Sequence, residues 1–142
     1  MGYCIELIDT TAVLHKGNFD AAVEALNNLE KTGKKSGGSW GPDGQTEKWF
    51  AWVATDWYKS GDIKKMIEEW RYHLYENEDG NLAVEYFDGE KYGDEDQLWN
   101  ALSPYMTGYI EMRGEDGEQW KWIFGGPKLQ TLNGRIVYDE RF

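Results

Sequence analysis

The sequence predicts an α+β protein: an antiparallel sheet of about five to seven strands with two or three helices packed on one face. Three observations predict this class. Several segments place apolar residues at helical spacing, and short runs of aromatic and β-branched residues lie between and after them. Three turns between such runs are of the X-Gly kind, namely Asp79-Gly80, Asp116-Gly117 and Asn133-Gly134. No break in composition divides the 142 residues, so we expect a single domain, 1–142.

The first half of the chain is expected to alternate strands and helices. Residues 3–8 form an apolar-rich run typical of a strand. Asn18 is expected to cap the first helix, because its side chain accepts from free N–H groups of the first turn. The apolar stripe of this helix is Phe19, Ala22, Val23, Leu26 and Leu29. Residues 33–45 contain five glycines and one proline and predict a loop, after which residues 48–55 resume as a strand.

Two further helices and six strands complete the prediction. Asp62 heads the second helix, and Asp94 with Gln97 resembles a capping box that begins the third. Pro104 lacks a backbone N–H, so the third helix is expected to end before it. The predicted strands pair as three hairpins: 72–76 with 82–87, 109–114 with 119–124, and 128–132 with 136–139.

The charge of the chain bears on its partners. There are 15 Lys and Arg against 26 Asp and Glu, a formal net charge of −11. A field of this sign repels nucleic acid and anionic membranes, so we expect neither as a direct partner and instead expect a basic protein. No apolar run reaches the ~18–20 residues of a membrane span, and the first residues lack a signal-peptide core, so we expect a cytoplasmic protein. The sequence predicts no particular oligomeric state.

The hairpin from Glu111 to Phe124 has two possible orientations. If Asp116-Gly117 is a two-residue turn, Arg113 faces Trp120 and Glu111 faces Trp122. With this face outward, the indoles offer a flat surface for a base, a sugar, a peptide or an arginine of a partner. With it inward, both indoles belong to the core and Arg113 stacks on one of them at the edge. Both orientations remain open at this level.

Acidic turns form a separate signal. Carboxylates crowd residues 76–79, 88–96 and 115–118, where the last turn holds Glu115, Asp116 and Glu118. If these carboxylates lie together, they would bind a basic surface as a row of phosphates does. The alternative is that the three segments are ordinary solvent-exposed turns. Their spacing matches no metal motif, and we predict no metal site. The loop predicted over residues 33–45 carries Trp40 and two lysines, which suits either a flap over a ligand or a surface loop.

No catalytic constellation is recognisable. His15 and His73 are the only histidines and stand in no zinc-protease motif. The Gly-Lys-Lys-Ser segment at 33–36 has the wrong order for a phosphate loop. We therefore predict no catalytic residue and no cofactor.

Four segments resemble a known family: "MGYC" at the start, the tryptophan pair at 49–52, "FDGEKYGDEDQLWNALSPY" and "YIEMRGEDGEQWKWIF". The family consists of short acidic uncharacterised proteins of bacteria, plasmids and phages, with no assigned activity. The resemblance covers nearly the whole chain, most firmly residues 87–124, although family members have a shorter loop near 33–45. It implies an accessory or anti-defence role and transfers no catalytic residue.

These observations favour a non-enzymatic interaction protein that binds a basic, nucleic-acid-binding protein by charge mimicry. The predicted partner-binding residues are Trp40, Glu111, Arg113, Glu115, Asp116, Glu118, Trp120 and Trp122. One alternative is a domain that binds a nucleotide-like or sugar-like ligand with its tryptophans and Arg113. Another is a hydrolase whose catalytic carboxylates are not recognisable from the sequence.

Overall fold

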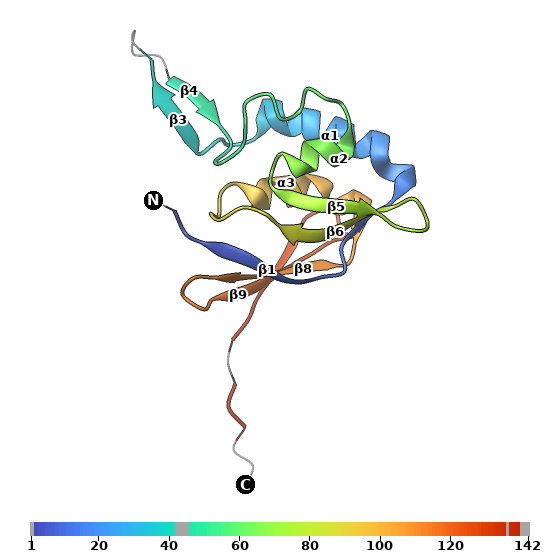
Figure 1. Cartoon of the computed structure of the whole chain (residues 1–142), viewed down its shortest axis with the longest axis vertical. Helices are drawn as coiled ribbons and strands as arrows, with labels where there is room; N and C mark the ends of the chain where they lie inside the picture. Colours follow the sequence, from blue (N-terminus) through green and yellow to red (C-terminus); the bar gives the residue numbers. More distant parts are fainter. Residues whose placement is uncertain (1, 42–45, 136, 140–142) are drawn as a thin grey trace.

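The structure, a computed structural model, describes residues 2–41, 46–135 and 137–139 (Figure 1). Within these residues, ten strands in antiparallel sheets and three α-helices confirm the α+β class. The helices are α1 (Phe19–Thr32), α2 (Ile63–Glu68) and α3 (Glu95–Leu102), with 3-10 turns η1 (Lys16–Asn18) and η2 (Ser103–Tyr105). The strands are β1 (Ile5–Thr10), β2 (Val13–Leu14), β3 (Gly37–Trp40), β4 (Thr46–Trp49), β5 (Tyr72–Glu76), β6 (Leu82–Phe87), β7 (Met106–Thr107), β8 (Tyr109–Gly114), β9 (Gln119–Ile123) and β10 (Gln130–Asn133). None of the described helices has the length and apolarity to cross a membrane.

The strands divide between two four-stranded sheets rather than forming the single sheet that the sequence predicts. Their orders are β1-β8-β9-β10 and β5-β6-β2-β7, and β3 pairs with β4 alone. The chain passes between the two sheets after β1 and again after β7, and these crossings touch at Thr11 and Gly108. A Cβ on Gly108 would lie 2.4 Å from the Thr11 carbonyl oxygen, and its φ of +88° is in the left-handed region. Glycine therefore permits the close crossing that separates the sheets.

Helix α3 connects the two sheets. In Figure 1 the three helices gather on one side of β5 and β6, while β1, β8 and β9 lie on the other side. The Trp99 ring of α3 lies 5.0 Å from the Tyr72 ring of β5 and 5.5 Å from the Phe124 ring after β9. All three side chains are buried. This aromatic core fixes α3, whose first turn borders both hollows described below.

Of the side chains predicted to cap the first two helices, one does so and the other does not. Asp62 caps α2 as expected, because its Oδ1 accepts from the N–H groups of Lys64 at 3.0 Å and Lys65 at 3.3 Å. Asn18 does not cap α1. Its amide nitrogen instead donates to the Tyr105 carbonyl at 3.1 Å, so the side chain binds the end of η2.

The capping box predicted for α3 is wrong, although the helix is confirmed. Oδ2 of Asp94 accepts from the Ser36 N–H at 3.1 Å, the Ser36 hydroxyl at 2.9 Å and the Ala51 N–H at 2.8 Å. Gln97 exchanges two hydrogen bonds, of 2.7 and 2.6 Å, with the backbone of Lys34. Both side chains therefore attach the base of the β3–β4 hairpin to α3.

Two predicted segments take another form. The predicted loop over 33–45 contains β3, which pairs with β4 in a hairpin. Residues 42–45, with the Pro-Asp-Gly turn, lie outside the described residues. The strand predicted over 48–55 stops with β4, because Phe50 and Val53 enter the core three residues apart, with a 3.0 Å turn hydrogen bond between their backbones.

The remaining hairpins are confirmed in two cases of three. Strands β5–β6 and β8–β9 occupy the predicted segments, and α3 ends before Pro104. The prediction of a third hairpin, between residues 128–132 and 136–139, is wrong as far as the described residues show. Strand β10 pairs with β9, and residues 137–139 belong to no strand.

Candidate recognition groove

The β8–β9 hairpin, which holds most of the predicted site residues, has a different register from the predicted one. Its loop has three residues, 115–117, and is closed by a 2.8 Å backbone hydrogen bond. Gly117 has φ +86°, the left-handed value that a three-residue hairpin loop requires at its last position. Arg113 therefore lies opposite Gln119 rather than Trp120. A slip of one residue exchanges the faces of a strand.

This register turns both indoles inward. Trp120 is 8% exposed and Trp122 is 0% exposed, and they share their face of the sheet with Ile110 and Met112. The outward orientation is therefore wrong, and both tryptophans are buried.

Glu111 and Arg113 occupy the outer face of the sheet, where they pair with neighbouring strands. Arg113 Nε donates to Glu6 Oε1 at 2.8 Å, so the expected stacking on an indole is wrong. Lys121 Nζ lies 3.8 Å from Glu111 Oε1 and 4.3 Å from the centroid of the Tyr109 ring. Such exposed pairs contribute about 0–1 kcal/mol each. The charges of this face are therefore largely matched within the sheet.

A hollow of about 430 Å³ is lined in part by these two indoles. Its lining residues are Tyr3, Tyr92, Asp96, Glu118, Trp120, Trp122, Thr131 and Asn133. The ring centroids of Tyr92 and Trp120 are 5.7 Å apart, and those of Trp120 and Trp122 are 6.0 Å apart with their planes at 74°. We call this hollow the aromatic groove.

Asp96 fixes the walls of the aromatic groove. Its Oδ1 accepts from Trp122 Nε1 at 2.9 Å, and its Oδ2 accepts from the Tyr92 hydroxyl at 2.5 Å. Burial, together with the bond to Asp96, raises the pKa of Tyr92, so this hydroxyl remains a donor. Glu118 also lines the groove, and its exposed carboxylate makes no hydrogen bond or ion pair with any described residue. The groove thus combines aromatic walls with one bound and one free carboxylate.

The acidic turn at 115–118 is attached to the beginning of the chain. The Glu115 carboxylate accepts from the Cys4 N–H at 3.1 Å, and the Tyr3 hydroxyl donates to Asp116. The bond to Asp116 raises the pKa of Tyr3 to about 12 and lowers the pKa of the Asp116 carboxyl. Tyr3 itself lines the aromatic groove, so this turn lies at the groove's edge.

The acidic loop at 88–96 lies against the same N-terminal residues. The Ile5 N–H donates to the Glu90 carbonyl at 2.9 Å, and Lys91 lies close to carboxylates of both turns. The third acidic turn, 76–79, is at the far end of the β5–β6 hairpin (Figure 1). Two of the three acidic turns therefore converge near the groove. Their exposed carboxylates are Asp88, Glu90, Asp96, Glu115, Asp116 and Glu118.

Trp40 is not brought to this groove. Its backbone lies in β3 opposite Thr46, and the β3–β4 hairpin projects away from the sheets (Figure 1).

Among the described residues, no three His, Cys, Asp or Glu side chains form a group able to hold a metal ion. His73 instead stacks on Tyr86, with ring centroids 4.4 Å apart.

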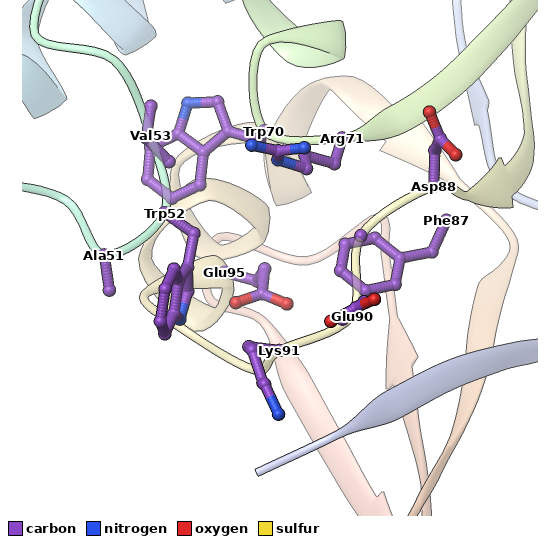
Figure 2. A pocket seen from close by; sticks show the side chains of 11 residues that line it. Ala51, Trp52, Val53, Trp70, Arg71, Phe87, Asp88, Glu90, Lys91 and Glu95 are labelled. Carbon is purple, nitrogen blue, oxygen red and sulfur yellow. The ribbon is translucent and has the colours of Figure 1, made fainter. Parts of the chain in front are cut away.

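A second hollow, of about 330 Å³, opens on another side of the 88–96 loop (Figure 2). We call it the Trp52 cleft. Trp52 and Phe87 lie on opposite sides of the Glu95 carboxylate, and Arg71 lies at one end. None of these residues is among the predicted site residues.

Glu95 is the buried carboxyl of the Trp52 cleft. It is 4% exposed and accepts from the Tyr72 hydroxyl at 3.0 Å and from the Gly93 N–H at 2.5 Å. Burial raises the pKa of Glu95 to about 7. A sequence signal for it exists, because Glu95 precedes Leu98 and Trp99 by three and four residues and so lies on the buried stripe of α3. The hydrolase alternative stays a prediction, with Glu95 as its best-placed carboxyl.

Comparison of the chain with protein-family models, curated proteins and solved structures gives no match. The resemblance to short acidic proteins of bacteria, plasmids and phages therefore stays a prediction.

Proposed function

We propose that this protein is a non-enzymatic recognition protein, and that its aromatic groove receives an arginine or lysine side chain of a basic protein partner. One observation carries the proposal. The groove places the rings of Trp120 and Tyr92 beside two carboxylates, those of Asp96 and Glu118. Aromatic rings next to carboxylates form a site for a cation that is partly shielded from water.

The two carboxylates have different roles in this proposal. Asp96 is held by Trp122 and Tyr92 and keeps the groove in shape before any partner arrives. Glu118 has no partner among the described residues and is available to accept from a guanidinium. A preformed site with one free acceptor binds without first breaking an internal ion pair, which favours affinity.

The surrounding charge defines the class of partner. The exposed carboxylates of the two converging turns extend the negative surface beyond the groove, in a chain whose net charge is −11. Such a surface accelerates association with a basic protein and weakens with added salt. A nucleic-acid-binding protein of the cytoplasm suits this charge, because the acidic turns would occupy its phosphate-binding surface. An accessory or anti-defence role on a mobile element is the corresponding biological proposal.

A peptide-binding experiment tests the proposal. Affinity for an arginine-rich peptide would be measured by calorimetry for the wild type, Glu118→Gln, and a control, Glu78→Gln, whose exposed carboxylate lies in the distant β5–β6 turn. We expect Glu118→Gln to weaken binding about five- to tenfold and Glu78→Gln to leave it nearly unchanged. Equal effects of both variants would show general charge attraction without a groove.

A further inference from the structure

The Trp52 cleft contains two unfavourable backbone conformations. Among the described non-glycine residues, only Trp52 and Arg71 have positive φ, at +66° and +74°. Both line this cleft, although they are 19 positions apart in the sequence. A side chain at positive φ is sterically strained, and such strain is concentrated at binding sites and active sites. The coincidence of both residues in one hollow points to a ligand site.

Trp52 presents a fixed aromatic surface to the cleft. The residue is 50% exposed, whereas five of the seven tryptophans whose burial is described are buried. Its Nε1 donates to the Tyr92 carbonyl at 3.3 Å and so orients the ring. The loop passes close behind it, because a Cβ on Gly93 would lie 3.0 Å from Trp52 Cδ1 and 2.8 Å from the Ala51 carbonyl oxygen. The exposed ring is therefore available for stacking.

Arg71 supplies a free cation at the end of the cleft. Its guanidinium makes no hydrogen bond or ion pair with a described residue, despite the excess of carboxylates in the chain. It also borders a neighbouring hollow that contains both cations and carboxylates, among them Lys59 and Asp56. An unpaired guanidinium is the usual anchor for a phosphate or carboxylate, because its planar donors pair with two oxygens.

Glu95 supplies acceptors within the cleft. Each of its oxygens accepts one hydrogen bond from the protein, one from the Tyr72 hydroxyl and one from the Gly93 N–H. A carboxylate has about four acceptor positions, so capacity remains for N–H donors of a ligand. In Figure 2 the carboxylate lies between the Trp52 and Phe87 rings, where the edge of a heterocycle stacked on Trp52 would arrive.

We propose that the Trp52 cleft binds a mononucleotide-class ligand: a planar base stacked on Trp52, its N–H edge on Glu95 and its phosphate on Arg71. The base that presents two adjacent N–H donors to one carboxylate is guanine, so guanosine monophosphate is the matching probe. The volume of about 330 Å³ lies at the lower end of the range for small-molecule sites. This site is separate from the aromatic groove and does not depend on the proposed protein partner.

Calorimetric titration of the full chain at about pH 8, where the Glu95 carboxyl with its pKa of about 7 is mostly ionised, tests the proposal with three probes: guanosine monophosphate, guanosine, and ribose 5-phosphate. We expect the nucleotide to bind with a Kd below about 1 mM, and each fragment to bind at least about tenfold more weakly. Arg71→Met is expected to weaken the nucleotide about tenfold without affecting guanosine, whereas Glu95→Gln weakens both. Arg113→Met, on the outer face, is the control and should bind like the wild type.

Three outcomes would overturn the proposal. They are no nucleotide binding at about 1 mM, guanosine binding as well as the nucleotide, or equal effects of Arg71→Met and Arg113→Met. Far-ultraviolet circular dichroism of each variant shows whether it is folded. If Glu95→Gln does not fold, the Arg71→Met comparison still decides the result, because Arg71 is exposed and unpaired.

Discussion

The indole Nε1 of Trp122 donates a 2.9 Å hydrogen bond to the carboxylate of Asp96, which joins the inner face of β9 to the first turn of α3. The other oxygen of Asp96 accepts from the Tyr92 hydroxyl. One carboxylate therefore connects a sheet, a helix and a loop. The same connection shapes the aromatic groove, so stability and recognition share this residue.

Replacement of Asp96 by Asn should lower stability. The amide retains one acceptor oxygen but presents an NH2 group where the carboxylate accepted a second bond, so a buried donor loses its charged partner. We expect the free energy of unfolding to fall by about 1–3 kcal/mol in urea titrations. Asp56→Asn is the control, because the Asp56 side chain is exposed and makes no hydrogen bond with a described residue. Similar losses in both variants would contradict the structural role of Asp96.

The pKa of Glu95 predicts a specific dependence of stability on pH. The folded value is about 7 and the ordinary value is 4.5, so the folded state favours the protonated form. Glu95 therefore contributes its full share to the free energy of unfolding below its ordinary pKa, where it is protonated in both states. This share is lost as the pH rises through about 7. Glu95→Gln stays neutral throughout. The stability of the wild type relative to Glu95→Gln should fall by about 3 kcal/mol from acidic to mildly basic pH.

Urea unfolding at several pH values measures this difference, with Glu85→Gln as an exposed control. Tyr72 does not interfere, because burial raises the pKa of its hydroxyl well above the range studied. A difference that is constant with pH would show that Glu95 is not buried as described.

The strain at Arg71 predicts that two small replacements differ. Arg71→Ala keeps a Cβ at φ +74°, whereas Arg71→Gly removes it. Neither loses an ion pair, because the guanidinium has none with a described residue. We expect the Gly variant to be more stable than the Ala variant by about 1 kcal/mol in urea unfolding. An Ala variant as stable as the Gly variant would mean that φ is not positive in solution.

Asp94 and Asp62 each directly precede a helix, but replacing them by Ala should have different effects. Asp94→Ala leaves three donors of Ser36 and Ala51 without their acceptor and so loosens the β3–β4 hairpin, which only Gln97 still attaches to α3 through side-chain hydrogen bonds. Amide hydrogen exchange should therefore increase over residues 33–51. Asp62→Ala removes only a helix cap, costs about 0.5–2 kcal/mol and leaves exchange at 33–51 unchanged. Unchanged exchange in Asp94→Ala would contradict the attachment.

The sequence predicts the elements well where local chemistry decides them. The β5–β6 and β8–β9 hairpins follow from alternating runs around Gly turns, and α1 and α3 follow from apolar stripes. The cap at Asp62 is also local. The division into two sheets is not, because it depends on the contact of Thr11 with Gly108, which are far apart in the chain.

The candidate site is less predictable from the sequence, because the conformation of one residue, or the partner of one side chain, changes which residues the site contains. The left-handed conformation of Gly117 makes a three-residue loop, and this one residue reverses which face of β9 is buried. Asp94 looks like a helix cap and instead binds a distant hairpin. The Trp52 cleft depends on the positive φ angles of Trp52 and Arg71, which the sequence pattern does not predict.

The recognition proposal is tested most directly by nuclear magnetic resonance. An arginine-rich peptide would be titrated into labelled protein while the indole N–H signals of Trp120, Trp122 and Trp57 are followed. Trp57 is the internal control, because its indole is buried elsewhere and donates to Glu30. The proposal predicts saturable shifts of the Trp120 and Trp122 signals with the Trp57 signal unmoved. Unmoved signals for Trp120 and Trp122 at saturating peptide would contradict it.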